Sequence, residues 1–299
     1  MNSGATTATA IDLMRNEYSA SKLRWGLVLL VQLVGVVVAV LGTGLRGPWV
    51  AVPAACTLAI PIASTLLKHW ATRYQARGDD LRRSLVLADG LGRTVDAEPI
   101  LIGAAEGTEV ASWDPAPIGS YFNSPMPAGP GRVVHIVQQS AFFSTRHAAA
   151  AALLCFLFAG TSTSLGVALL WLFVHAALAM TSATVASAAS ALLAFGVGGE
   201  FLAVGLSFWR LQDAARATVR ACGSLLRTST IDQSQLLAVT GGYDSAIGQA
   251  PPVPGFLYRI QRRRLEKAWR LTDPQRPATT APGVPQPSLP RMTAPNEGR

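Results

Sequence analysis

The sequence is poor in charged residues. Only 14% of its 299 residues are Asp, Glu, Lys or Arg, against about 25% in a typical soluble domain. The shortage is local, because Arg46 is the only charged side chain from Trp25 to Leu67 and Glu200 is the only one from Ala148 to Trp209. Helices with water on one side need a charged or polar outer face. These two blocks therefore exclude an ordinary soluble helical bundle.

Cysteine and catalytic motifs are also scarce. The three cysteines, Cys56, Cys155 and Cys222, form no CxxC or Cys/His spacing, so the sequence predicts neither a disulfide framework nor a zinc site. There is no GxSxG, no HExxH, no P-loop and no GxGxxG before a helix, and the four histidines are scattered. We therefore expect a protein that is not an enzyme and that holds no metal and no cofactor.

The first uncharged block is long enough for two membrane spans. Crossing ~30 Å of hydrocarbon takes about 20 apolar residues in a helix. Trp25–Gly42 supplies one such run, with Gln32 as its strongly polar member, and Pro48–Leu67 supplies the next. Thr43–Gly47 is a tight break between them. We predict a helical pair that crosses the bilayer and returns.

The second uncharged block, Ala148–Trp209, has 62 residues. This length is too great for one span and suits two spans joined by a turn. We place the third span at about 150–173 and the fourth at about 185–208, with the turn near His175–Thr184. The chain is thus predicted to be an all-α membrane protein with four transmembrane helices.

The positive charge predicts the orientation. Two short connections join the paired spans, Thr43–Gly47 and His175–Thr184, and together they hold one Arg. The other 24 Lys and Arg lie in the N-terminal segment, the loop at 68–149 and the tail. Cytoplasmic loops carry the excess of Lys and Arg. Both termini and the long loop are therefore expected in the cytoplasm. The predicted order is a cytoplasmic N-terminal segment (1–24), transmembrane helices 1 and 2 (25–67), a cytoplasmic helical loop module (68–149), transmembrane helices 3 and 4 (150–208), a cytoplasmic helical tail (209–270) and a Pro-rich tail expected to be disordered (271–299).

Four helices are predicted outside the membrane, and three of them continue a span into the cytoplasm. The fourth helix is strongly basic and follows a proline turn, and it has two interpretations. It could lie on anionic lipid, which is the simpler interpretation, or it could contact a phosphorylated ligand. The four helices are Lys68–Gly92, Arg132–His147, Leu211–Arg227 and the basic helix at 254–270, with Arg259, Arg262, Arg263, Arg264, Lys267 and Arg270.

Glu200 is the strongest single candidate for a functional residue in the predicted spans. A charge inside the membrane costs ~2.5–3.5 kcal/mol on insertion scales, so such residues usually face a partner, a bundle interior or water. Gly198 and Gly199 beside it would allow another helix to approach closely. One hypothesis places Glu200, Gly198, Gly199 and Gln32 at a pore or its gate. The simpler alternative is a protonated or paired structural glutamate near the cytoplasmic interface.

Several short motifs in the soluble parts have a recognisable pattern. Within the loop the sequence reads GSYFNS, then GPGR and then QQSAFFST, and a proline run precedes the basic helix. These motifs begin at Gly119, Gly129, Gln138 and Pro251, and an earlier Arg15-x-x-Tyr18-x-x-x-Lys22 accompanies them.

In layout and in these motifs, residues 10–270 resemble the SMODS-associated four-transmembrane effectors. The chain departs from that family's pattern at Gln139, where an acidic residue is expected before the serine. The resemblance implies a pore-forming effector of bacterial anti-phage defence in the inner membrane. It implies a cyclic oligonucleotide as the cytoplasmic signal, a nucleotidyltransferase as functional partner, and a homo-oligomer. No DNA or RNA binding is expected.

A cyclic nucleotide needs cations for its phosphates and aromatic faces for its bases. The loop module supplies both kinds of side chain, although most of them also suit ordinary helix surfaces and turns. The candidate ligand residues are Arg73, Tyr74, Arg77, Tyr121, Phe122 and Arg132.

Two other functions remain open at this level. A small ion or solute transporter would usually show paired broken helices and more intramembrane charge than this sequence has. A membrane scaffold that recruits a cytoplasmic partner is compatible with a loop that has no catalytic residue.

Overall fold

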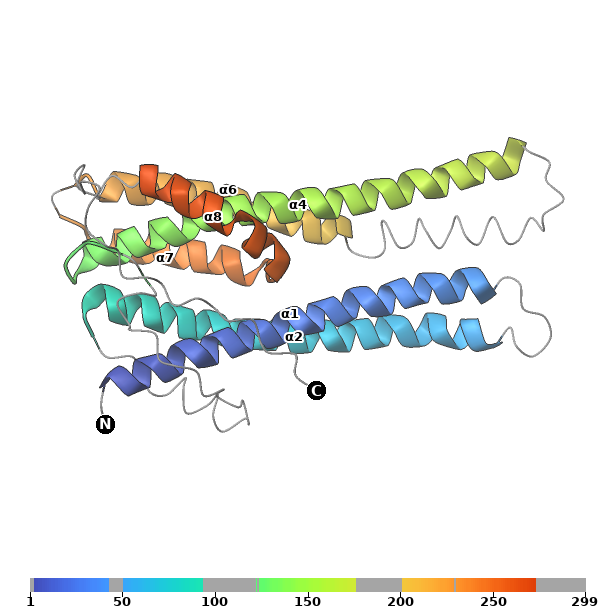
Figure 1. Cartoon of the computed structure of the whole chain (residues 1–299), viewed down its shortest axis with the longest axis horizontal. Coiled ribbons are helices and arrows are strands. Elements are labelled where there is room, and N and C mark those ends of the chain that lie inside the picture. Colours follow the sequence, from blue (N-terminus) through green and yellow to red (C-terminus); the bar gives the residue numbers. More distant parts are fainter. Residues whose placement is uncertain are drawn as a thin grey trace.

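The computed structural model describes residues 3–42, 51–93, 122, 124–228 (without 176–200) and 230–272. This part of the chain forms six helices and no strand (Figure 1). The helices are α1 (Ser3–Gly42), α2 (Ala51–Leu91), α4 (Pro130–His175), α6 (Phe201–Leu225), α7 (Gln233–Gly248) and α8 (Gly255–Thr272).

Helices α1 and α2 pack side by side as an antiparallel pair, here called the first hairpin (Figure 1). Midway along the pair the hydroxyl of Ser21 donates to the backbone oxygen of Ala71 at 2.9 Å. Towards the end where α1 connects to α2, Gly35 lies so close to Ile60 that a Cβ added at Gly35 would come within 2.8 Å of its side chain. Small residues therefore allow the two long helices to stay in contact over most of their length.

Helices α4 and α6 form a second antiparallel pair, the second hairpin (Figure 1). Gln138 near the start of α4 donates to the backbone oxygen of Val219 near the end of α6 at 3.4 Å. At the opposite end Gly205 meets Phe156, where an added Cβ would come within 2.7 Å of the ring. Both hairpins therefore use a glycine for close helix packing in their apolar halves.

Helix α8 docks along α4 in the opposite direction. Its buried residues, Leu257, Leu265 and Trp269, follow one face at helical spacing. The Trp269 ring lies 5.3 Å from the ring of Phe142, centroid to centroid. The Tyr258 ring lies 5.1 Å from that of His147, so the start of α8 is beside a later turn of α4. The predicted basic helix is therefore present, with one apolar face packed on the second hairpin.

The buried cores lie at the end of the molecule that also holds the charged residues. One cluster joins α2, α4, α6 and α7, a second joins α1 and α2, and a third joins α4, α6 and the start of α8. On the parts of α1 and α4 that lie away from these clusters, many large apolar side chains are exposed. On α1, Leu30 and Leu33 are 53% and 50% exposed, and on α4 Leu157 and Trp171 are 54% and 62% exposed.

Two helices of the described part are long and apolar enough to cross a membrane, Ala10–Val38 on α1 and Pro130–Ala168 on α4. Within the most apolar stretch of each helix, only 11% (α1) and 22% (α4) is buried, whereas the core helix of a soluble protein is mostly buried. The sequence predicts four spans, whereas the described residues contain two candidates. The other two expected spans, Pro48–Leu67 and 185–208, lie partly outside the described residues.

The predicted soluble helices exist, although their limits differ from the sequence-based ones. Lys68–Gly92 forms the second half of α2, and Arg132–His147 forms the first part of α4. The tail helices correspond to α6 and α8. Helix α7 was not predicted, because its sequence has three glycines and no clear apolar stripe. The expected turn at 176–184, most of the 93–130 segment and the Pro-rich tail from 273 lie outside the described residues.

Candidate functional site

Three of the predicted ligand residues lie together on α2. Arg73 is exposed, and Tyr74 and Arg77 are partly buried. The guanidinium carbon of Arg24, on α1, lies 3.8 Å from the centre of the Tyr74 ring, and that of Arg77 lies 5.5 Å from it. Arginine over an aromatic face is a cation–π contact. This part of α2 therefore presents a cationic surface whose aromatic ring already stacks with protein cations.

Arg132 has a different environment. Its guanidinium donates to both carboxylate oxygens of Asp89 at 3.1 Å and to the backbone oxygen of Met126 at 3.1 Å. The Arg132 and Asp89 side chains are only 20% and 13% exposed. Next to this pair, the Gly129 amide donates to the backbone oxygen of Gly90 at 2.7 Å. Arg132 therefore joins the start of α4 to the end of α2.

The predicted ligand residues do not form one compact group. Tyr74 and Asp89 are 15 residues apart on one helix, a separation of about 22 Å at 1.5 Å per residue. Arg132 is thus distant from the cationic surface of α2. Phe122 packs against two of the buried clusters, and Tyr121 lies outside the described residues.

Of the predicted pore residues, only Gln32 can be placed. It lies on α1 with a partly buried side chain, and its Oε1 atom has no hydrogen-bond partner among the described residues. Gly198, Gly199 and Glu200 lie outside the described residues.

The structure reveals a polar cluster that the sequence did not predict, here called the junction network. It consists of Tyr18, Asp79, Arg82, Asp244 and Tyr243. The Tyr18 hydroxyl donates to Asp79 at 2.6 Å within the first hairpin. Arg82, on α2, forms an ion pair and a hydrogen bond with Asp244, on α7. The network therefore connects the two hairpins.

Tyr243 extends the junction network into α4. Its side chain is 1% exposed, and its hydroxyl lies 3.0 Å from the Ser140 hydroxyl and 2.7 Å from that of Ser144. The Arg82 guanidinium carbon is 5.6 Å from the Tyr243 ring centre. Polar groups on α1, α2, α4 and α7 thus contact one another in one buried region. On the outer side, Arg83 Nε donates to Asp244 at 3.1 Å.

Burial controls the electrostatics of the junction network. It raises the pKa of Asp79, against the opposing effects of the Tyr18 hydrogen bond and of Arg82. Burial by itself would lower the pKa of Arg82, but the neighbouring tyrosines and carboxylates outweigh it, so the pKa of Arg82 is raised. Burial also raises the pKa of Tyr243. Arg82 therefore remains charged, and removing its partner would leave a buried cation uncompensated.

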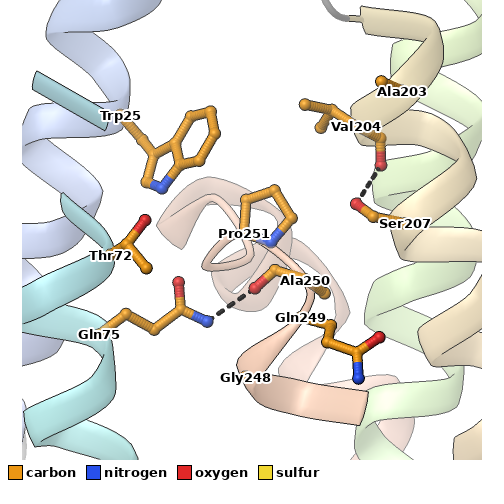
Figure 2. Close-up of a pocket in the computed structure, with 10 residues that line it drawn as sticks. All are labelled: Trp25, Thr72, Gln75, Ala203, Val204, Ser207, Gly248, Gln249, Ala250 and Pro251. Carbon is orange, nitrogen blue, oxygen red and sulfur yellow. Dashed lines mark hydrogen bonds between the residues drawn. The ribbon is translucent and has the colours of Figure 1, made fainter. Parts of the chain in front are cut away.

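A second connection joins α2 of the first hairpin to the end of α7, which packs on the second hairpin, and it lies beside a small pocket. The Gln75 amide donates to the backbone oxygens of Ile247 at 3.2 Å and Ala250 at 2.6 Å. The neighbouring pocket has a volume of about 270 Å³ and separates the side chains of the two hairpins (Figure 2). Its lining consists of Trp25, Thr72, Gln75, Ala203, Val204, Ser207, Gly248, Gln249, Ala250 and Pro251.

The outer face of α8 is a cationic surface. All six of its cations are exposed, and five of them have no ion pair with another described residue. Arg262, the sixth, pairs with Glu266 at 2.7 Å. The five are Arg259, Arg263, Arg264, Lys267 and Arg270.

The described residues contain no group of His, Cys, Asp and Glu that could hold a metal ion. The junction network was not predictable from a motif, because Arg82 and Asp244 are separated by 162 positions. Arg82 lies in a charged stretch of α2, and Asp244 is the only charged residue of α7. Charged side chains usually face water, so the sequence offered no sign that this pair is buried. What the arrangement can do is hold two helical pairs together through charge.

No family model, no curated protein and no solved structure matches this chain.

Proposed function

We propose that the chain is a pore-forming effector of the bacterial inner membrane, gated by a cyclic oligonucleotide on its cytoplasmic side. The observation that carries this proposal is the contrast between the two ends of each hairpin. One end has buried cores and charged surfaces, and the other exposes long apolar side chains such as Leu33 and Leu157. Exposed apolar helix of this length is stable in lipid and unfavourable in water.

The topology in the proposal has four spans. Helices α1 and α4 supply candidate spans, and their antiparallel partners α2 and α6 run beside them. The apolar runs Pro48–Leu67 and 185–208 would then return the chain to the charged side. In this arrangement the termini, α7 and α8 lie in the cytoplasm, on the side that the positive charges favour.

Gating would be a movement of the two hairpins relative to each other. Each hairpin is a tightly packed unit, and the described connections between them include charged and polar groups such as Arg82 with Asp244 and Gln75 with Ala250. A ligand can open such a protein only if it binds the open arrangement more tightly than the closed one. Oligomers of the chain would then surround the pore, with Glu200 as the expected pore residue.

The signal is expected to bind at the α2 surface formed by Arg73, Tyr74 and Arg77. The cations there suit phosphates, and displacement of Arg24 would free the Tyr74 face for a base. Arg132 is the weaker candidate, because Asp89 and the Met126 oxygen already occupy its donors.

The test is co-expression with a cyclic-oligonucleotide-producing nucleotidyltransferase, read as depolarisation of the inner membrane. We expect Arg73→Ala and Glu200→Ala to abolish depolarisation at unchanged protein level. Arg132→Ala and its partner variant Asp89→Ala form a matched pair. A structural role predicts the same loss in both, whereas a ligand role of Arg132 predicts a loss in Arg132→Ala alone. If purified protein binds no cyclic oligonucleotide, the gated-effector proposal is wrong.

The cationic face of α8 favours one second candidate function, recruitment of an acidic cytoplasmic partner by a membrane scaffold. Reversing Arg263 and Arg264 to Glu would abolish such recruitment and leave cyclic-oligonucleotide binding unchanged. If these reversals abolish depolarisation but not ligand binding, the output passes through a partner. If they change neither, the scaffold function is excluded.

A further inference from the structure

The pocket between the hairpins has a composition that differs from the surrounding cytoplasmic surface. Its described lining holds no Lys, Arg, Asp or Glu and combines apolar side chains with a few neutral polar groups. Figure 2 shows Trp25 and Thr72 reaching in from the first hairpin, with Val204 and Ser207 opposite. Without a cation to balance phosphate, this is a poor site for a free nucleotide.

The pocket lies at the level where the helices change from charged to apolar. Trp25 follows Arg24 and begins the first apolar run. On α2, Thr72 is one turn beyond Lys68, and on α6 Ser207 precedes Trp209 and Arg210. Tryptophan and the flanking cations mark the boundary between hydrocarbon and headgroups. In the proposed topology the pocket therefore opens at the glycerol level of the cytoplasmic leaflet.

The hydrogen bonds of the pocket leave one donor unused. The Ser207 hydroxyl donates to the backbone oxygen of Val204 at 2.7 Å, and that of Thr72 donates to Lys68 at 2.9 Å. Gln75 donates to the Ala250 backbone. The indole Nε1 of Trp25 is buried and has no hydrogen-bond partner among the described residues. A buried N–H group without an acceptor is costly, so a neutral acceptor in this pocket would be stabilising.

We infer that this pocket holds the glycerol-ester region of a membrane phospholipid, with an ester carbonyl accepting the Trp25 indole hydrogen. A volume of about 270 Å³ is below the ~300–1,000 Å³ of sites for whole drug-sized ligands, which suits part of a larger molecule. The acyl chains would continue along exposed apolar side chains of α1 such as Leu29 and Leu33. The inference rests on the proposed membrane function and adds a lipid that separates the two hairpins.

The experiment compares diester and diether phospholipids that share one headgroup, by native mass spectrometry of the full chain purified from a bacterial membrane. An ether oxygen is a weaker acceptor than an ester carbonyl. Wild type should retain the diester lipid with a roughly two- to tenfold preference, the range that one ordinary hydrogen bond gives. Trp25→Phe keeps an aromatic ring, removes the N–H and should abolish the preference.

Matched controls are available on α6. Trp209 lies at the same level, is 50% exposed and does not line the pocket, so Trp209→Phe should keep the preference. Val204→Trp fills the pocket and should lose the retained lipid, whereas Leu202→Trp, at a 44% exposed position on the same helix, should keep it.

Two outcomes would overturn the inference. One is equal retention of diester and diether lipid by wild type, and the other is the same loss in Trp25→Phe and Trp209→Phe. A separate experiment asks whether the chain floats with lipid when the same membranes are subjected to flotation, and it tests the proposed membrane location. A chain that fails to float is not a membrane protein. A chain that floats but shows no ester preference contradicts only the pocket assignment.

Discussion

Both apolar and polar side chains connect the two hairpins: Val86 of α2 packs into the α4–α6–α7 core, and Arg82 of α2 pairs with Asp244 of α7. Arg82 and Asp244 are 12% and 11% exposed, and their pairing is supported by Arg83 from the outer side. A buried ion pair adds little net stability, because both ions lose hydration on burial, but loss of one partner is severe. Single substitutions in the junction network should therefore cost much more stability than substitutions in an exposed ion pair.

We predict that Asp244→Asn lowers the free energy of unfolding by about 3 kcal/mol, because the buried Arg82 cation loses its counter-charge. Asp80→Asn is the matched control. Asp80 is 65% exposed and pairs with Arg83 at 3.6 Å, so its loss should cost less than ~0.5 kcal/mol. Denaturant unfolding in micelles, followed by circular dichroism, measures both. Equal small losses would show that Arg82 is solvated.

At the scale of elements, each hairpin depends on close packing of two long helices. In the second hairpin, Gly205 faces Phe156, and an added Cβ would also come within 3.2 Å of the Cys155 side chain. Elsewhere on α4, Gly160 has nothing within 4 Å of its added Cβ. The two glycines thus occupy crowded and open positions of the same hairpin.

We expect Gly205→Ala and Gly160→Ala to change stability in opposite directions. An added methyl at Gly205 must displace Phe156 or separate the helices, which costs about 1–3 kcal/mol. At Gly160 the methyl meets no obstacle, and alanine favours the helix by roughly 0.5–1 kcal/mol. Thermal unfolding of the two variants in micelles gives the comparison. Similar stability changes in both would mean that α4 and α6 do not touch at Gly205.

At the scale of the whole molecule, the proposed topology gives the hairpins a direction across the membrane, because one end of each is charged and the other is apolar. Helices α7 and α8 pack on the charged end, with the basic face of α8 turned outward. The proposed topology places this end in the cytoplasm and the Thr43–Gly47 connection on the other side.

We predict that a membrane-impermeant maleimide labels Thr43→Cys in intact inner membranes and labels Gly241→Cys only after lysis. Gly241 is exposed on α7, and nothing lies within 4 Å of its added Cβ, so the thiol is accessible. The background replaces Cys56, Cys155 and Cys222 with alanine. Labelling of both positions in intact membranes would contradict the topology.

The sequence predicted an all-α chain and many helix positions, which the described residues confirm, whereas those residues contain two candidate spans of the four predicted. Charge-free runs and the flanking cations indicated membrane helices, and the soluble helices at 68–92, 132–147, 211–227 and 254–270 are present within α2, α4, α6 and α8. Helix α7 escaped prediction because its residues gain helical stability by packing Leu236 and Tyr243 into the α4–α6 core.

The candidate site was harder to predict. Arg132 was expected to bind a ligand, and the structure shows its guanidinium engaged by Asp89. The same residue types serve phosphate binding and internal ion pairing, so composition alone does not separate them. Only the position of Asp89 beside Arg132 reveals which donors are occupied.

The sequence by itself determined where the chain can enter a membrane, because the cost of moving charge into hydrocarbon depends on which residues are consecutive. It also determined which end carries the cations. The tertiary structure decided which polar groups meet, since Arg82 and Asp244 lie 162 positions apart and approach each other only through helix packing. It also decided that the Trp25 indole, an ordinary interfacial residue in the sequence, faces a neutral pocket between two hairpins.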